Sequence, residues 1–416
     1  MSGKRILYFK PPFDIGAGPK NIETFNFDFP LEINLVFLRI ETDTPEIVFC
    51  SIDTLYIGAV LTRKIGNLIN QWYPNAKVIA AASHSHNSPM LDETKPILGS
   101  VNVENHSIVL RAIKDIVSEF ASRNYNKSEK ISVSKVNFTI STSISRRRKV
   151  RFVFHEKKFK LQSVLRLPSN EYGEGELTSQ VIKLMSGENL CAIIWIYPCH
   201  PVSHPDSRTI SSHYIGYVRS KLRMYFGIKD LPIIFLQGAS GDIRPKSFNF
   251  RNSHKSVLKR LLFGETFDDF SQFGFEKWLH SVWCEVEKAC TSFGDVTRIY
   301  NSKIDTYFVP LSALFPNSEV SERTFEVCIV QLENIKMIGV SAEPTWQFAS
   351  SVRLNSSIDC FFGCIGDSYG YLASEKQCIE GGYEARDYMK YFSLGKYTPI
   401  KYEKLIANWL YSILHP

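Results

Sequence analysis

The sequence predicts an α/β fold, and three observations support this prediction. Short apolar runs rich in β-branched residues recur along the chain. A polar or glycine-rich loop follows each of these runs, and helix-like patterns separate several of them. Strands that alternate with helices in this way are typical of sheets with helices packed on their faces.

The predicted strands are the apolar runs at 46–53, 77–84, 190–200, 232–242 and 335–343. The helical pattern IGAVLTRKIGNLINQWY follows the first run, and IGYVRSKLRMYF follows the third. In α/β proteins, ligands bind beyond the carboxyl ends of the strands, where loops stand on a rigid base. Each of the last four runs ends in residues that can bind a metal or polarise a substrate. We therefore expect the functional site at these strand ends.

The composition is that of an ordered globular protein, because 44% of the 416 residues are hydrophobic and 22% are charged. We treat residues 1–416 as a single domain, in which 247–278 is an insertion that serves either as surface decoration or as a lid. The net charge of +7 is modest, and no RNA- or DNA-binding motif accompanies it. A nucleic acid partner is therefore not expected, and an anionic group on a small substrate explains the charge equally well.

The cysteines indicate a reducing compartment. There are nine of them, an odd number, and no CxxC pair occurs. The start MSGKRILYFKPP lacks the apolar stretch of a secretory signal, and no apolar run has the length of about 18 residues that a transmembrane segment needs. We expect a cytoplasmic protein without a transmembrane segment, and the sequence does not indicate an oligomeric state.

Histidines at two strand ends are candidate metal ligands. His84 and His86 end the second run, and residues i and i+2 of an extended segment point to the same side. Neutral imidazole is a common zinc ligand, so the pair fits either a metal site or the ordinary polar end of a strand. His200 follows the third run between two prolines, and the same two interpretations remain open for it.

Carboxylates and tyrosines follow the other two runs. Asp242 ends GASGD, whose glycines allow close approach to a ligand but also fit an ordinary tight turn. Glu343 stands before a helical pattern, where it is either a charge at the helix N-terminus or a metal ligand. Tyr369, Tyr371 and Tyr383 come next, and such residues are by default packing aromatics.

Taken in order, these segments resemble the neutral (alkaline, non-lysosomal) ceramidases, zinc-dependent amidases that release a fatty acid from a sphingoid amine. SHSHNSP at 83–89 looks like the family's THTHSGP, and CHPVS at 199–203 matches its second histidine motif. SAEPT at 341–345 stands where the family has GEF followed by threonines, and YGYLASEKQCIEGGYEA at 369–385 resembles its tyrosine segment. The resemblance implies a ceramidase-like catalytic domain with mixed sheets and flanking helices.

The resemblance also implies the roles of individual residues. Zinc would be bound by His84, His200, Glu343 and Tyr371. In catalysis, His86 would face the substrate carbonyl or the attacking water, and Tyr371 would also stabilise the developing oxyanion. Asp242 would orient a neighbouring group. Gly16, Arg146 and Arg244 would line the substrate-binding site. Arg147 is the alternative to Arg146 if the register of ISRRR slips by one residue.

Two departures from the family pattern bear on the substrate. Ceramidases have GDVSP, with a serine implicated in catalysis, where this chain has GDIRP and therefore Arg244. The chain also ends at Pro416, which leaves no room for the C-terminal immunoglobulin-like domain of full ceramidases. The sequence therefore does not decide whether ceramide is the substrate, and Arg146 and Arg244 suggest an acidic group on the substrate.

The sequence thus favours a cytoplasmic zinc-dependent amidohydrolase or deacylase, which cleaves the amide bond of a small or lipid-like N-acyl compound with metal-activated water. One alternative is a catalytically silent binding protein that has kept the ceramidase-like fold. Another is a zinc hydrolase of an ester or peptide bond, because the same metal chemistry serves those bonds.

Overall fold

The structure is a computed structural model of the chain. It describes residues 2–16, 21–22, 26–39, 46–122, 131–147, 149–150, 153–155, 158–160, 164–165, 176–247, 267, 269–315, 323–354, 358–395, 406, 408–409 and 412. Its body consists of three sheets, together with several short two-stranded pairs.

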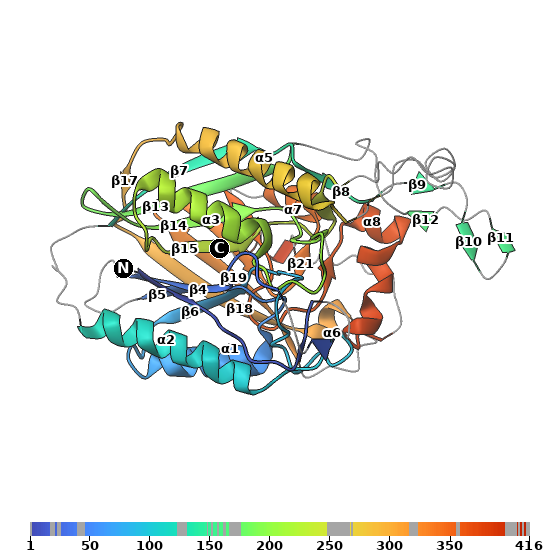
Figure 1. The fold of residues 1–416 in the computed structure, drawn as a ribbon, viewed down its shortest axis with the longest axis horizontal. Helices are drawn as coiled ribbons and strands as arrows, with labels where there is room; N and C mark the ends of the chain where they lie inside the picture. Colours follow the sequence, from blue (N-terminus) through green and yellow to red (C-terminus); the bar gives the residue numbers. More distant parts are fainter. Residues whose placement is uncertain are drawn as a thin grey trace.

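The first sheet has the strand order β1-β4-β5-β6 and carries the two histidines of SHSHNSP at the end of its edge strand. Its strands are β1 (Ser2–Ile6), β4 (Glu32–Leu38), β5 (Ile47–Ile52) and β6 (Lys77–Ala82). Only β5 and β6 are parallel to each other. Helices α1 (Gly58–Asn70) and α2 (Glu104–Ser122) cover one face of this sheet (Figure 1).

The second sheet has the order β15-β14-β13-β7-β17. Its strands are β7 (Ile131–Thr139), β13 (Thr178–Ser186), β14 (Asn189–Tyr197), β15 (Ile233–Gln237) and β17 (Thr297–Arg298). Strands β14 and β15 are parallel, so the loops that carry His200 and Asp242 leave the sheet at the same end. Helices α3 (His213–Phe226) and α5 (Gln272–Cys290) cover its outer face (Figure 1).

The third sheet has the order β18-β19-β20-β22 and continues into the short segments of the C-terminal part. Its strands are β18 (Ser302–Pro310), β19 (Thr324–Leu332), β20 (Ile335–Val340) and β22 (Cys360–Phe362). The helical segments that follow its strands are α6 (Leu311–Leu314), α7 (Trp346–Leu354), α8 (Glu375–Glu380), the π-helix η2 (Tyr383–Asp387) and the 3-10 helix η3 (Met389–Tyr391).

Short pairs connect the loops around these sheets. They are β8 (Ser143–Ser145) with β16 (Ile243–Pro245), β21 (Glu343–Pro344) with β23 (Tyr371–Leu372), β2 (Phe13–Asp14) with β3 (Asn21–Ile22), β9 (Lys149–Val150) with β12 (Val164–Leu165), and β10 (Val153–His155) with β11 (Lys158–Lys160). In two of them both partners follow strands of one sheet: β8 and β16 follow β7 and β15 of the second sheet, and β21 and β23 follow β20 and β22 of the third.

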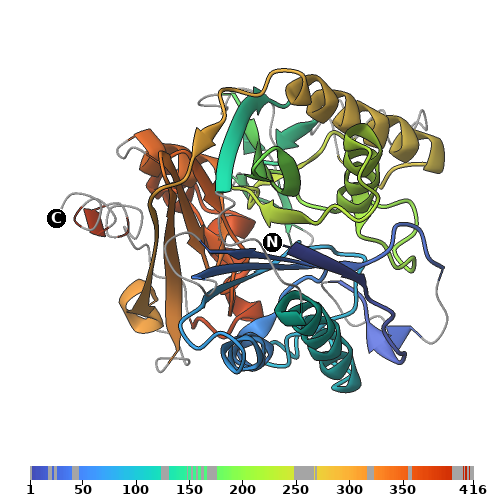
Figure 2. The same ribbon diagram turned by 90° about the vertical axis from the view of Figure 1, so that its left-hand side faces the viewer.

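The three sheets share a central core. Figure 2 shows them surrounding one central region. Phe49 of the first sheet, Ile194 and Ile234 of the second, and Val330 and Met337 of the third belong to one buried cluster. A β-bridge also joins Ala81 to Ile365, and another joins Gly238 to Phe362. The ends of β6, β15 and β22 are thereby held close to one another.

The predicted α/β fold with mixed sheets is confirmed, and each of the five apolar runs contains a strand. The sequence patterns did not reveal the long antiparallel strands β13, β18 and β19. In β18 partly covered residues are interspersed with exposed ones, so it lacks the continuous apolar run of a strand buried on both faces. Strands β13 and β19 each contain four consecutive buried residues, but those of β13 include the polar Ser179 and Gln180.

The predicted insertion at 247–278 falls largely outside the described residues, because 248–266 and 268 are not among them. Its described end forms the first turns of α5, where Phe275 and Trp278 pack into the core beside α3. None of the helices in the described part of the chain has the length and apolar character needed to cross a membrane.

Candidate metal site

The segments that follow three strands bring a histidine and carboxylate cluster together in the interior. His84 follows β6, His200 follows β14, and Glu343 begins β21 just after β20. The ligand nitrogens of His84, His86 and His200 all lie within 4.8 Å of one another. His84, His200 and Glu343 are each at most 2% exposed. These three side chains are therefore buried, whereas His86 is partly exposed.

A main-chain carbonyl fixes the orientation of His84. Its backbone has a positive φ of 62°, and its Nδ1 lies 3.1 Å from the carbonyl oxygen of Leu55. A carbonyl only accepts hydrogen bonds, so Nδ1 must carry the proton. In a neutral ring Nε2 would present its lone pair to the cluster. Burial disfavours the charged ring, but the Glu343 carboxylate and Cys364 outweigh it and raise the pKa of His84 well above its usual value. This Nε2 lies 3.2 Å from Oε2 of Glu343, and it makes no hydrogen bond of acceptable geometry within the described structure.

His200 is held in the same way from the other side. Its Nδ1 lies 2.6 Å from the carbonyl oxygen of Ser240 and 3.3 Å from that of Ile243. The proton therefore again sits on Nδ1, and Nε2 faces Oε2 of Glu343 at 3.0 Å. The hydroxyl of Ser240 points elsewhere, because it accepts a hydrogen bond from the side-chain amide of Gln237.

The position of Glu343 is set by the β21–β23 pair. It is the register partner of Tyr371, and its N–H donates to the carbonyl of Gly370 at 2.6 Å. The hydroxyl of Tyr56 donates to Oε1, so Oε2 is the oxygen that faces both histidines. Burial disfavours the ionised carboxyl, but the neighbouring His84 and His200 outweigh it and hold the pKa of Glu343 well below its usual range.

This arrangement fits a metal ion. In each neutral imidazole the proton is on Nδ1, so Nε2 of His84 and Nε2 of His200 both direct a lone pair at Oε2 of Glu343. Three electron-rich atoms then face one another. Either a proton on an imidazole or a metal cation between them resolves this conflict. Nitrogen and carboxylate ligands at about 2 Å from one ion are the ones that zinc binds, and carbonyls behind the histidines are its usual supporting groups. The histidine group is therefore one that could hold a metal ion.

His86 is the third imidazole of the cluster. Its ring centroid lies 5.1 Å from that of His84 and 5.9 Å from that of His200. Its Nε2 is buried without a hydrogen-bond partner in the described part of the chain. Burial, together with the charge of the other two histidines, holds the pKa of His86 well below its usual value. Gly16 packs against the main chain of His86 and has a φ of 66°, so a side chain there would collide with the His86 carbonyl.

Tyr371 and Arg146 lie on one side of the cluster. The Tyr371 ring stacks near His200, with ring centroids 6.4 Å apart, and its hydroxyl accepts a hydrogen bond from Nη2 of Arg146 at 3.4 Å. Burial and the Glu343 carboxylate raise the pKa of Tyr371 well above its usual value. The Arg146 guanidinium also donates to Oε1 of Glu384 at 2.6 Å and to the carbonyl of Gly241 at 2.9 Å. Three groups of the protein thus already engage Arg146.

Arg147 and Arg244 occupy different surroundings. Arg147 donates to Oε2 of Glu384 at 2.8 Å and to the carbonyl of Gly381, below the short helix α8. Arg244 lies on β16, where it donates to Ser203 and stands over the Phe267 ring at 4.6 Å. The guanidinium that lies beside Tyr371 is therefore that of Arg146.

Asp242 has a positioning role in the structure. It accepts hydrogen bonds from the hydroxyl of Ser145 and the main-chain N–H of Trp346, both at 2.8 Å, and from the Gln377 amide at 3.3 Å. These three partners belong to β8, α7 and α8. Asp242 therefore links the turn after β15 to β8, to the start of α7 just after Glu343, and to α8.

The sequence patterns missed Tyr56 and Glu384. Tyr56 is 3% exposed, its ring lies 5.1 Å from that of His84, and its hydroxyl donates to Glu343. Its place in the sequence could have identified Tyr56. It follows β5 as His84 follows β6, and because β5 and β6 are parallel neighbours, the residues after them lie at the same end of the sheet. Glu384 lay within the YEA motif, but nothing in the spacing connected it to the arginines of ISRRR.

The fold and the site together define a mixed α/β protein with a buried candidate metal centre at converging strand ends. No family model and no curated protein matches the sequence. Among solved structures, the neutral ceramidase from Pseudomonas aeruginosa is similar with a TM-score of 0.71 and 13% identity, covering 99% of this chain and 74% of that chain. A ceramidase complexed with C2 is similar with a TM-score of 0.70 and 12% identity, with the same coverage. The chain thus has a ceramidase-like fold, which matches the resemblance of its motifs.

Proposed function

We propose that this protein is a zinc-dependent hydrolase that cleaves the amide bond of an N-acyl compound. The observation that carries this proposal is the pair of histidine nitrogens, each oriented by a main-chain carbonyl and each facing Oε2 of Glu343 at 3.0 and 3.2 Å. The ceramidase-like fold supports an amidase over other hydrolases, because the two similar structures are ceramidases.

His84, His200 and Glu343 would hold the zinc, and Tyr371 would complete the set. When bound, the metal would polarise the substrate carbonyl and lower the pKa of water, so attack on the amide needs no serine. This matters because Arg244 stands at the position of the family serine. Ser240 is not a substitute, since its hydroxyl is bound to Gln237 and its carbonyl holds His200.

The chain's own residues would handle the protons and the charge. His86 presents a buried nitrogen with no partner among the described groups, so it can take a proton from the attacking water and deliver it to the leaving amine. The Tyr371 hydroxyl and the Arg146 guanidinium bonded to it would stabilise the negative charge that develops on the carbonyl oxygen. Gly16 would keep His86 in place by its close main-chain contact.

The substrate would be small or lipid-like and would carry an acidic group. Arg146 is already engaged by Glu384 and Gly241, so it serves Tyr371 better than a substrate carboxylate. Arg244 is the better candidate for binding an acidic group. Equal turnover of acidic and neutral amides by the wild-type enzyme and by Arg244→Ala would remove this part of the proposal.

We also propose that the protein works in the cytoplasm. All nine cysteines are free thiols, and seven of them are buried, among them Cys50, Cys199 and Cys328. Free thiols in this number are typical of a reducing compartment.

The test combines metal analysis with a substrate panel. The purified protein should contain about one zinc per chain, and His84→Ala or Glu343→Ala should lose the metal. His280→Ala is the matched control, because His280 is exposed on α5, where its Nε2 lies 3.6 Å from the sulfur of Cys284. Full zinc occupancy in both site variants would contradict the ligand assignment.

The substrate panel contains N-acyl amino acids, N-acyl sugars, acyl-peptides and ceramide, together with matched esters. We expect hydrolysis of at least one amide, with a loss of several powers of ten in His84→Ala. In His86→Ala the metal should remain while turnover falls. A zinc-loaded wild type that hydrolyses only esters or peptides would support the ester or peptide hydrolase, and one that hydrolyses nothing would support the silent binding protein.

A further inference from the structure

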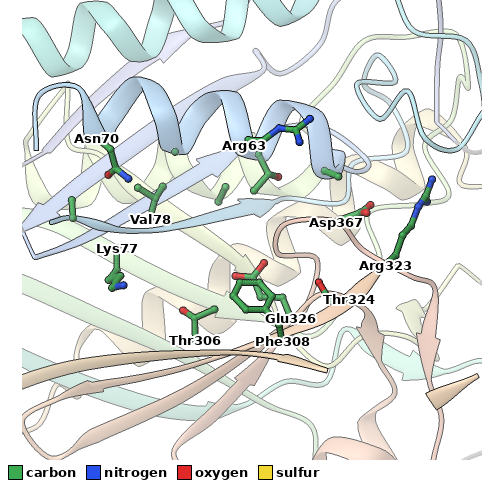
Figure 3. Close-up of a pocket in the computed structure, with 15 residues that line it drawn as sticks. Arg63, Asn70, Lys77, Val78, Thr306, Phe308, Arg323, Thr324, Glu326 and Asp367 are labelled. Atoms are coloured by element: carbon green, nitrogen blue, oxygen red, sulfur yellow. The ribbon is translucent and has the colours of Figure 1, made fainter. Parts of the chain in front are cut away.

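A cavity lies at the amino end of β6, the strand whose carboxyl end leads to the metal site. It has a volume of about 510 Å³ and is bounded by α1, by the first half of β6 and by one face of the β18–β19 hairpin (Figure 3). Lys77, Val78 and Ala80 of β6 line it, whereas His84 follows the carboxyl end of the same strand. None of the proposed metal ligands lines this cavity.

Glu326 is the distinctive group in this cavity. Its side chain projects from β19 and is mostly buried, and no hydrogen bond or ion pair reaches its carboxylate within the described part of the chain. The nearby acid Asp367 differs, because Lys95 pairs with it at 2.8 Å and the Tyr369 hydroxyl donates to it. Lys95 also pairs with Asp92, so its charge is already shared.

The pKa of Glu326 reflects the lack of a positively charged partner among the described residues. Burial, followed by the charge of Asp367, raises the pKa of Glu326 to about 7. A carboxylate in a cavity with no counter-charge is costly, and a cation supplied from outside removes that cost. The cavity therefore favours a ligand with a positively charged end at Glu326.

The rim of the cavity has the opposite charge. Lys77, Arg63 and Arg323 line it, and no acidic side chain pairs with any of them among the described residues. Figure 3 shows Lys77 toward one end, Arg323 and Asp367 toward the other, and Glu326 between them. A purely cationic ligand would be repelled by this rim, whereas an anionic group on the same ligand would be attracted to it.

Apolar surface lies between the two charged regions. Phe308 is the register partner of Glu326 on β18 and remains 61% exposed at the cavity. Val78 and Ala80 line the opposite wall. A short aliphatic body between the charged ends of a ligand would cover these side chains.

We propose that this cavity is a binding site for a small zwitterion, in which an ammonium group pairs with Glu326 and a carboxylate at the far end of a short aliphatic chain pairs with Lys77. The dimensions agree with this class. Glu326 Oε2 lies against Gly366, whose N–H donates to the Ala80 carbonyl at 2.9 Å. Lys77 is three residues from Ala80, about 10 Å along a strand that rises about 3.3 Å per residue.

Direct binding tests this proposal without any need for activity at the metal site. Calorimetric titrations at pH 8 use γ-aminobutyrate, δ-aminovalerate and ε-aminocaproate, with hexylamine and caproate as probes that each lack one charge. We expect saturable binding of at least one ω-amino acid, at least tenfold tighter than either single-charge probe. Glu326→Gln should weaken it at least tenfold, and Lys77→Gln should reduce the amino acid to the affinity of hexylamine.

Glu287→Gln is the matched control, because Glu287 is an exposed acid on α5 that lies outside the cavity. The Glu287→Gln variant should bind each probe with the same affinity as the wild type. Thermal unfolding of each variant establishes that it is folded, and removal of an unpaired acid in Glu326→Gln should not lower the midpoint. No saturable binding of any ω-amino acid, or equal binding by Glu326→Gln, would overturn the proposal. Hexylamine binding as tight as that of ε-aminocaproate would overturn the zwitterion requirement.

Discussion

At the scale of single residues, Tyr56 has the clearest untested role. Its hydroxyl donates to the Glu343 oxygen that does not face the histidines, and its buried ring packs beside His84. A hydrogen bond to a ligating carboxylate selects which oxygen is turned toward the ion. Tyr56 is therefore a positioning residue of the proposed metal site rather than a ligand.

Replacing Tyr56 with phenylalanine should weaken zinc binding by roughly 10- to 100-fold, the usual cost of removing such a supporting group. The ring remains, so the packing against His84 should be preserved and the protein should stay folded. Competition of the zinc-loaded protein with a chelator measures the change. Tyr300→Phe is the control, because Tyr300 is 58% exposed and distant in sequence from every proposed ligand. Equal zinc affinity in Tyr56→Phe and wild type would show that Glu343 needs no such support.

At the scale of elements, the site depends on contact between two turns. Gly241 lies in the turn after β15, and its N–H donates to the Pro344 carbonyl at 2.8 Å. A Cβ at Gly241 would lie 2.7 Å from the Glu343 carbonyl oxygen and 3.1 Å from that of Pro344. The same turn supplies the Ser240 carbonyl that orients His200. The approach of these two main-chain segments thus sets the separation of His200 and Glu343.

We expect Gly241→Ala to push β21 away from this turn and to lower zinc occupancy, even though the substitution adds only a methyl group. Metal content and the thermal midpoint measure the effect. Gly66→Ala is the matched control, since no atom lies within 4 Å of a Cβ at that helical position. It should retain zinc and stabilise α1 by up to about 1 kcal/mol. A zinc content in Gly241→Ala equal to that of the control would mean that the turn adapts without cost.

How much of the candidate site the sequence predicts differs from residue to residue. His84, His200 and Glu343 could be found because each directly follows an apolar strand, and strand ends meet at one edge of a sheet. Tyr371 could be selected among three tyrosines only through the resemblance to a known family. The pairing of Arg146 and Arg147 with the single carboxylate of Glu384 depends on contacts across more than two hundred residues, which no local pattern encodes.

The cavity around Glu326 shows the same limit. Its walls come from α1, β6, β18 and β19, and β18 contains no continuous apolar run that would predict a strand. An acidic residue in an antiparallel strand looks like an ordinary solvent-facing position. Only the tertiary arrangement shows that Glu326 is covered and lacks a partner among the described side chains.

At the scale of the whole molecule, a buried ion pair joins the first sheet to the helix layer of the second. Arg223 of α3 donates from both terminal nitrogens to the two oxygens of Glu32 on β4, each at 2.7 Å. Burial alone would raise the pKa of Glu32, but the hydrogen bonds from Arg223 and the charges of Arg219 and Arg223 lower it to about 2. The ionised form of Glu32 is therefore strongly preferred in the folded state.

This pair should make stability depend on acid pH. The folded pKa of about 2 lies below the ordinary value of 4.5, so the stabilisation is fully present above about pH 5 and is lost as the pH falls toward 2. The shift of about 2.5 corresponds to roughly 3 kcal/mol of unfolding free energy. Urea unfolding between pH 7 and pH 3 should show a smaller loss of stability in Glu32→Gln than in wild type. Glu287→Gln should follow the wild type, and parallel curves for all three proteins would contradict this account.

The orientation of both imidazoles by main-chain carbonyls has a consequence for how the protein can diverge. The groups that receive the Nδ1 protons are the carbonyls of Leu55 and Ser240, and a carbonyl is present whatever side chain the residue carries. Mutations at those two positions can therefore accumulate without removing the support of the site. An evolutionary lineage can thus rewrite most of its sequence around such a centre while retaining the geometry. The 13% identity to a solved ceramidase of similar fold, over 99% of this chain, shows how far a sequence can change while the fold remains.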